Sequence, residues 1–277
     1  MAIQRVFDSH LHIIDFSHPV QENQGYTPPE FLVPAYNVWR EKLRGEGFDI
    51  TAGAVVSGSF QGFDQGYLAD ALGELDNFVG VTQLPADVPD AEIRRLDGLG
   101  VRAVRFNFRR GGSAAREDLE ELAWRIYDLA GWHVELYVDA AALGEMAPVL
   151  KKLPAVSIDH LGLSAQGVDG LLELVDAGVK VKATGFGRVD LDPGEVVRRI
   201  VDVDPTALMA GTDLPSQRAS RVFSVEDFRL IEKAAGVLAD DVFYANAARF
   251  YGGLNDKTCC FSACRVKRHF VLVGVGV

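Results

Sequence analysis

The chain has 277 residues, and its 28 lysines and arginines against 39 aspartates and glutamates give a formal net charge of −11. Hydrophobic residues make up 48% and charged residues 24%, a globular composition that excludes an intrinsically disordered chain. The acidic balance argues against nucleic acid or an anionic membrane surface as a partner, and no apolar run reaches the ~20 residues of a membrane span. Arg5 and Asp8 stand where a secretion signal would need its apolar segment, so we expect a cytoplasmic protein.

Eight short apolar runs, rich in β-branched residues, predict eight strands. They cover residues 3–8, 52–57, 78–83, 101–106, 133–138, 155–159, 179–184 and 208–211. A loop and an amphipathic stretch follow each run; in residues 225–238, Phe228, Ile231 and Ala235 recur every three or four positions after a predicted N-cap at Ser224. Apolar strands that alternate with helices indicate a parallel sheet covered on both faces. Eight such units in about 250 residues predict an α/β fold, a single-domain (β/α)₈ TIM barrel, rather than an open doubly wound sheet.

The C-terminal residues differ in composition from the rest of the chain. Residues 255–277 contain four basic residues and one acidic residue, together with all three cysteines, Cys259, Cys260 and Cys264. Three clustered cysteines match neither a disulfide framework nor the spacing of a zinc knuckle. We therefore expect a barrel domain over residues 1–254 and a tail without an assigned role over residues 255–277.

Four residues at predicted strand ends are candidates for catalysis, because catalytic groups in a barrel lie at the C-terminal ends of the strands. The first strand runs into His10 and His12, and side-chain alternation along a strand places both imidazoles on one face. Two imidazoles so placed suit a divalent metal ion, although such a pair also arises by chance. His160 follows the sixth strand, and Asp213 follows the eighth, where it could instead cap a helix or form an Asx turn. Together they predict one site at the mouth of the barrel.

Five motifs in order, FDSHLHI, VRAVRFNF, IDHLG, KATG and GTDLP, carry a family resemblance. Over about residues 7–252 the chain resembles the amidohydrolase superfamily, in particular the branch of the 2-pyrone-4,6-dicarboxylate lactonases. The resemblance implies that Asp213 is a general base, and that His10, His12 and His160 polarise the reacting carbonyl. They would do so directly or through one divalent ion, zinc or manganese, held by the same four residues. Some lactonases of this family look metal-independent, and the fifth strand offers no lysine that could bridge two metals, so we expect one metal ion or none.

Polar residues at other strand ends are candidates for binding an anionic substrate, because a guanidinium group binds a carboxylate through two hydrogen bonds. The candidates are Arg105, Asn107, Tyr137, Lys182, Arg188 and Arg218. The resemblance to the dicarboxylate lactonases implies that Arg105, Tyr137 and Arg188 match residues that hold the substrate carboxylates in those enzymes. Leu163, however, stands where these lactonases tend to carry an arginine, and neither Arg109 nor Arg110 is in register with their second one. The ring dicarboxylate is therefore less favoured than a smaller or differently substituted anionic lactone.

The sequence predicts a hydrolase that opens a lactone or cyclic ester of a carboxylated small molecule. Two alternatives use the same barrel residues: a metal-dependent decarboxylase of an unsaturated or aromatic acid, and a lactone isomerase. A binding barrel without catalytic activity is the remaining alternative. We expect a small anionic substrate as the partner, with neither nucleic acid nor membrane, and a homo-oligomer is compatible with the sequence.

Overall fold

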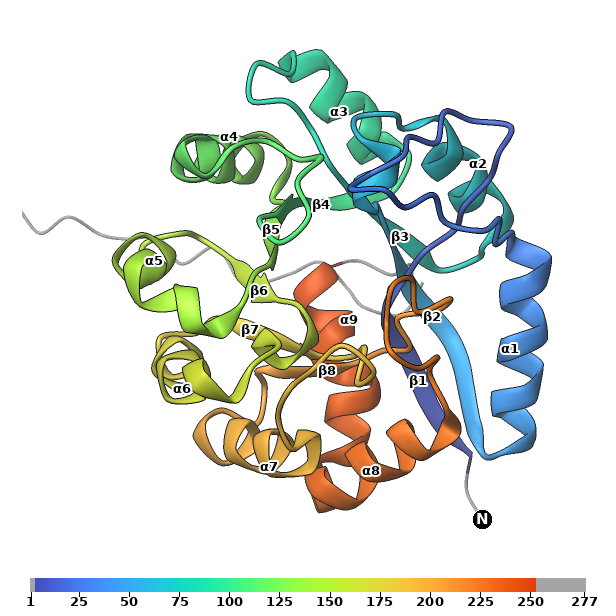
Figure 1. Cartoon of the computed structure of the whole chain (residues 1–277), viewed down its shortest axis with the longest axis vertical. Coiled ribbons are helices and arrows are strands. Elements are labelled where there is room, and N and C mark those ends of the chain that lie inside the picture. Colours follow the sequence, from blue (N-terminus) through green and yellow to red (C-terminus); the bar gives the residue numbers. More distant parts are fainter. Residues whose placement is uncertain (1–2, 253–277) are drawn as a thin grey trace, which may run out of the picture.

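The computed structural model describes residues 3–252, which form a barrel of eight parallel strands surrounded by helices (Figure 1). The strands lie in chain order around the sheet, and this confirms the predicted α/β (β/α)₈ TIM barrel. Their bounds are β1 (Gln4–Leu11), β2 (Phe48–Val56), β3 (Phe78–Thr82), β4 (Val101–Asn107), β5 (His133–Tyr137), β6 (Val156–Ile158), β7 (Lys180–Ala183) and β8 (Leu208–Ala210). The tail expected over residues 255–277 and the domain boundary expected at residue 254 lie outside the described residues.

Helices α1 to α8 lie around the sheet, and α9 lies within the ring of strands in the view of Figure 1. Their bounds are α1 (Val33–Gly45), α2 (Gly66–Glu74), α3 (Asp90–Gly98), α4 (Leu119–Ala130), α5 (Leu143–Leu150), α6 (Val168–Asp176), α7 (Pro193–Val203), α8 (Val225–Ala235) and α9 (Asn246–Tyr251). Across residues 3–252, none of the helices combines the length and apolar character that a membrane crossing requires.

Apolar side chains fill the end of the barrel that α9 covers. Phe7 of β1, Ala103 of β4 and Met209 of β8 belong to one buried cluster with Tyr251 of α9. The rings of Phe7 and Tyr251 are stacked, with centroids 5.2 Å apart. Burial of such large apolar surfaces is the main source of stability in a folded chain. The N-terminal end of the barrel is therefore a packed core.

The barrel closes beyond the end of β8, through the segment that carries Asp213. The backbone N–H of Asp213 donates to the carbonyl of His10 (2.7 Å), and the N–H of His12 donates to the carbonyl of Leu214 (2.8 Å). At Gly211 a Cβ atom would lie 2.8 Å from the backbone nitrogen of His10, so only glycine permits this close approach. The sequence after β8 thus fixes Asp213 beside His10 and His12.

The observed β1 differs from the predicted strand in length and regularity. It runs on to Leu11, so that His10 lies inside the strand, and its pairing register with β2 shifts between Asp8 and Leu11. Phe7 packs inside the barrel, whereas Leu11 belongs to the core cluster outside it. In a regular strand Phe7 and Leu11 would lie on one face and His10 on the other. The irregularity in pairing therefore turns His10 toward the barrel interior.

The predicted start of α8 is confirmed. The hydroxyl of Ser224 accepts a hydrogen bond from the N–H of Glu226 (3.1 Å), and the carboxylate of Asp227 accepts one from the N–H of Ser224 (3.2 Å). The helix ends earlier than expected, because Gly236 has a positive φ of 57° and stops it after Ala235.

Candidate active site

The structure brings the four predicted catalytic side chains together, and all four are buried. The Nε2 atoms of His10 and His12 lie 4.0 and 3.7 Å from Oδ1 of Asp213. The rings of His10 and His160 have centroids 4.8 Å apart. These residues come from the end of β1 and the residue just after it, the turn after β6 and the turn after β8, so the predicted convergence at one end of the barrel is present.

Backbone strain and a glycine hold His160 and Asp213 in place. Both residues have positive φ, 52° for His160 and 59° for Asp213, a conformation that non-glycine residues seldom adopt outside functional sites. Gly185 packs between them: a Cβ atom there would lie 2.7 Å from Nδ1 of His160 and 2.9 Å from Oδ2 of Asp213. Any larger residue at position 185 would push the two side chains apart.

Hydrogen bonds orient the imidazoles of His12 and His160. Nδ1 of His12 lies 2.7 Å from the carbonyl oxygen of Val56. Since a carbonyl only accepts, this nitrogen carries a proton, and in the neutral ring Nε2 presents a lone pair toward Asp213. Nδ1 of His160 bonds the hydroxyl of Thr184 (2.8 Å), which can donate or accept.

The histidines are neutral and Asp213 is poised to take a proton. Burial and, next, Arg105 lower the pKa of His12 to about 3, and burial lowers the pKa values of His10 and His160 well below the ordinary value. Burial raises the pKa of Asp213, although Arg188 opposes this shift. The guanidinium of Arg188 donates two hydrogen bonds to Asp213, from Nε to Oδ2 (2.6 Å) and from Nη2 to Oδ1 (3.2 Å).

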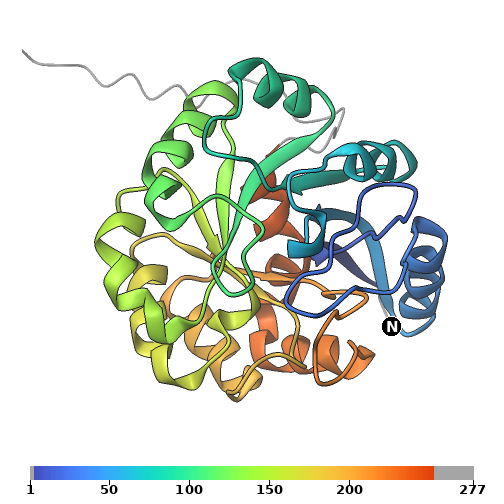
Figure 2. The ribbon, with the colours of Figure 1, turned by 45° about the horizontal axis from the view of Figure 1, so that its top comes forward.

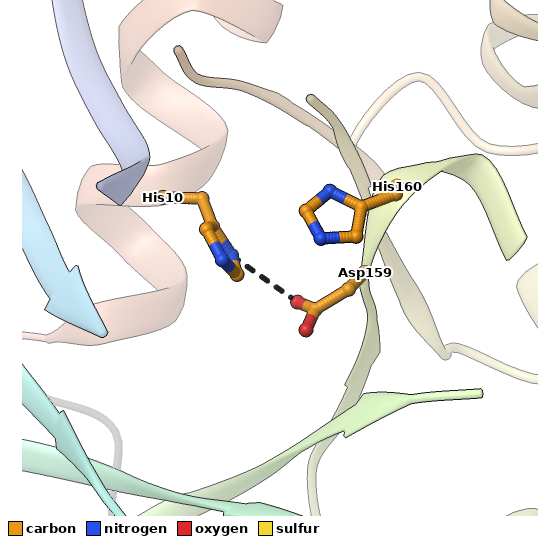
Figure 3. Close-up of side chains that lie close together, drawn as sticks. All are labelled: His10, Asp159 and His160. Carbon is orange, nitrogen blue, oxygen red and sulfur yellow. Dashed lines mark ion pairs between the residues drawn. The ribbon is translucent and has the colours of Figure 1, made fainter. Parts of the chain in front are cut away.

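Asp159 is a residue of the site that the sequence prediction missed. Its Oδ1 lies 3.4 Å from Nδ1 of His10, and Figure 3 shows the two side chains facing each other beside His160. Its Oδ2 accepts two hydrogen bonds from Arg105, from Nε (3.0 Å) and Nη2 (2.8 Å). Although burial raises the pKa of Asp159, Arg105 and Lys182 lower it overall, so the carboxyl is ionised. Its position immediately before His160, at the end of the sixth strand, was the available signal.

Two groups of three buried side chains could each hold a metal ion. Within each group, the ligand atoms lie within 4.8 Å of one another. One group is His10, Asp159 and His160, and the other is His10, His12 and Asp213. Among the described residues, Nε2 of His10 and Oδ1 of Asp159 are buried without a hydrogen-bond partner. Imidazole and carboxylate donors at this spacing fit one zinc or manganese ion, and His10 belongs to both groups. Arg105 and Arg188 already balance the charges of the two aspartates.

A cavity opens above His12 and His160, and most of the predicted substrate-binding residues line it. From the predicted residues it is lined by His12, Arg105, Asn107, Tyr137, His160, Arg188 and Arg218. Its other lining residues are Gly58, Ser59, Phe60, Arg110 and Gln217. They lie on loops after β2, β4 and β8, where no periodic pattern marks a side chain as facing the site.

Lys182 lies in a different position from the one expected for a substrate-binding residue. It is fully buried inside the barrel and does not line the cavity. Its Nζ forms an ion pair with Glu135 and lies 3.4 Å from Nδ1 of His10. The physical reason is its place within β7, one residue before the strand ends, so that the side chain points into the barrel interior.

The loop between β1 and α1 lies beside the loops that follow β2 and β4 (Figure 2). The side chain of Asn23 donates to the carbonyl of Arg110 (3.1 Å) and accepts hydrogen bonds from Arg218 (3.2 Å) and from the hydroxyl of Ser59 (3.1 Å). The ring of Tyr26 lies under the guanidinium of Arg218, at 4.5 Å. This loop therefore fixes the two outer arginines, Arg110 and Arg218, at the rim.

The fold and the site are those of an amidohydrolase-type barrel, and the sequence matches the amidohydrolase family over residues 7–253. The chain belongs to this family. A 2-pyrone-4,6-dicarboxylate hydrolase of Comamonas testosteroni is 28% identical over 237 aligned residues, and the match covers 75% of this chain and 76% of the relative.

Two solved structures show how far the similarity extends. A candidate 2-pyrone-4,6-dicarboxylic acid hydrolase from Pseudomonas putida has a TM-score of 0.71 at 26% identity, over 90% of this chain and 97% of that one. A probable 2-pyrone-4,6-dicarboxylic acid hydrolase from Acinetobacter baumannii has a TM-score of 0.75 at 19% identity, over 90% of this chain and 99% of that one. At 19% identity the second likeness shows the shared barrel fold alone.

Proposed function

We propose that the protein hydrolyses a lactone, or another cyclic ester, of a carboxylated small molecule. The observation that carries the proposal is the buried carboxylate of Asp213 beside three neutral imidazoles, at the base of a cavity lined with arginines. Similarity to a 2-pyrone-4,6-dicarboxylate hydrolase supports a cyclic ester as the substrate class.

Asp213 is the proposed general base. It removes a proton from a water molecule as the water oxygen bonds to the carbonyl carbon of the substrate. The ring C–O bond then breaks, and the proton passes from Asp213 to the departing ring oxygen. The product is the open hydroxy acid, which contains the atoms of the lactone and of one water molecule. Burial raises the pKa of Asp213, and this strengthens it as a base.

His10, His12 and His160 are the proposed groups that polarise the carbonyl. A divalent ion, where one binds, would be held by His10, His12 and Asp213 and would supply Lewis-acid chemistry. Without an ion, a ring N–H would donate a hydrogen bond to the carbonyl oxygen. Elemental analysis and assays after chelation separate the two: direct polarisation predicts full activity of the stripped protein, whereas an essential ion predicts loss that zinc or manganese restores.

Arg110 and Arg218 are the proposed contacts for the anionic group of the substrate. Within residues 3–252 neither of them forms an ion pair, whereas Arg105 and Arg188 are each paired with an aspartate. The cavity that these arginines line is the proposed binding place of one small ring compound. We therefore propose an anionic lactone whose carboxylate faces the rim and whose ester carbonyl faces the histidines.

A panel of anionic lactones tests the proposal. The purified protein should open at least one of them with release of one proton per turnover and without carbon dioxide. Release of carbon dioxide without ring opening would indicate a decarboxylase, and interconversion of two lactones without proton release would indicate an isomerase. Either result would contradict the proposed hydrolysis.

A further inference from the structure

A buried group of charged side chains lies below the active site, around Lys182 of β7. The Nζ atom of Lys182 faces three acceptors: a carboxylate oxygen of Glu135, Nδ1 of His10 at 3.4 Å, and Oδ1 of Asp159 at 3.7 Å. All four side chains are fully buried. An ammonium group has three N–H donors and no acceptor, so this environment matches its hydrogen-bonding capacity.

Glu135 is itself held on the side away from the site. Its Oε1 accepts a hydrogen bond from the hydroxyl of Tyr251 (2.6 Å) and lies 3.1 Å from Nε2 of His133. Tyr251 belongs to α9 and is stacked on Phe7 of the apolar core. The position of Glu135, and with it that of Lys182, is therefore fixed by the packed end of the barrel.

The contact with Lys182 decides which nitrogen of His10 carries the proton. Since the ammonium group only donates, Nδ1 of His10 accepts, and the proton of the neutral ring lies on Nε2. Asp159 would favour the opposite arrangement, but its Oδ1, 3.4 Å from Nδ1, has no hydrogen-bond partner among the described residues. We propose that Lys182 is a positioning residue that holds His10 in the Nε2–H tautomer.

His10 and His12 then present opposite groups to the reacting centre. His12 donates from Nδ1 to the carbonyl of Val56 and presents a lone pair at Nε2, whereas His10 presents an N–H. Nε2 of His10 is buried, 4.0 Å from Oδ1 of Asp213 and without a partner among the described residues, so we assign its N–H to a hydrogen bond with the substrate carbonyl, although His12 and His160, and not His10, line the cavity. A metal ion at Nε2 of His10 would have to displace this proton, so Lys182 also weakens the binding of an ion by His10.

The assignment of this hydrogen bond to the substrate carbonyl rests on the proposed lactone hydrolysis, but the tautomer does not. Nitrogen-15 NMR of the histidine-labelled full chain shows which ring nitrogen is protonated, and a His10→Gln spectrum identifies the signals of His10. We expect the proton on Nε2 in the unmodified protein. A proton on Nδ1 of His10 would overturn the proposal, whatever the protein's substrate.

Removal of the ammonium group should switch the tautomer. Lys182→Met leaves Glu135 buried without its cation and could unfold the protein, so the main variant is Glu135→Gln with Lys182→Met, in which both charges are removed. Glu135→Gln alone is the matched control, because it keeps Lys182. In the double variant Asp159 becomes the acceptor for Nδ1–H of His10, and the proton should leave Nε2. If it stays on Nε2, the proposal is wrong.

Zinc affinity gives a second readout that needs no substrate. In the double variant Nε2 of His10 is free to bind with His12 and Asp213, so zinc should bind roughly 10-fold or more tightly than in Glu135→Gln, in line with other changes next to metal-binding histidines. His10→Gln added to the double variant should abolish the gain. The cysteines at positions 259, 260 and 264 are present in every variant, so any zinc they bind does not affect the comparison. Equal affinities would contradict the proposal.

Lys180→Met, on the same strand but paired with Asp204 outside the site, should match the unmodified protein in both readouts.

Discussion

The two ends of the barrel interior differ in what they bury. The end that α9 covers contains a cluster of apolar side chains such as Phe7, Ala103 and Met209, with His133 and Glu135 beside Tyr251, whereas the opposite end contains the histidines of the site and the ion pairs of Asp159 and Asp213. An unpaired buried charge is costly, and at the second end each carboxylate that faces the histidines has a cation against it. Stability and chemistry are therefore separated along the barrel axis, and substitutions at the two ends should have separable effects.

The largest effect should come from Asp213→Asn, which removes the proposed base and keeps the size of the side chain. We expect the turnover rate to fall about 10²- to 10⁴-fold, the usual contribution of a general base. Steady-state kinetics with the best lactone of the panel measures this effect. Asp70→Asn, which changes an exposed carboxylate on α2, is the control and should leave turnover unchanged. Activity within about tenfold of the unmodified protein would show that Asp213 is not the base.

Met209→Ala should have the converse effect, because Met209 belongs to the apolar end. Loss of a fully buried methionine leaves a cavity and should lower the free energy of unfolding by about 2–5 kcal/mol. Urea denaturation measures the loss, and the turnover of the folded protein should change little. A large fall in turnover with normal stability would contradict the separation of the two ends.

Arg218→Met should raise KM for the anionic lactone roughly 10-fold or more, because a hydrogen bond to a charged group contributes about 1.5–3 kcal/mol. The turnover rate should change less, since Arg218 lies at the rim and not beside Asp213. Arg229→Met on α8 removes an exposed arginine that pairs with Glu46 and serves as the control. An unchanged KM would remove Arg218 from the proposed binding site.

Ser224→Ala should have the smallest effect, on stability alone. The lost N-cap hydrogen bond of α8 should lower the free energy of unfolding by about 1 kcal/mol without any change in kinetics. Thermal or urea denaturation measures it. A change in KM would show that this helix contributes to the site in a way that its contacts do not indicate.

The sequence predicted the fold well because the same hydrophobic pattern of strand and helix repeats along the chain. Continuous apolar strands and amphipathic helices recur eight times, and each observed strand overlaps its predicted run. The observed ends of β1 and α8 differ from the predicted ones. An irregularity in strand pairing decides the end of β1, and Gly236 decides the end of α8.

The site was predictable where a side chain stands at a strand end, and less so where it stands within a strand or a loop. His10, His12, His160 and Asp213 come together as the strand-end rule predicts. Glu135 and Lys182 lie inside strands, where the sequence does not show that two opposite charges from β5 and β7 will meet. Arg110 and Gln217 lie on loops without a periodic pattern.

A single turnover in water labelled with oxygen-18 tests the central claim most directly. If Asp213 is a general base, the water oxygen bonds to the substrate, so the opened lactone carries one labelled oxygen in its new carboxylate and Asp213 carries none. Mass spectrometry of the product and of the peptide that contains Asp213 measures both. An unlabelled product together with a labelled Asp213 would show that the carboxylate attacks the substrate itself, and the account of Asp213 as a base would be wrong.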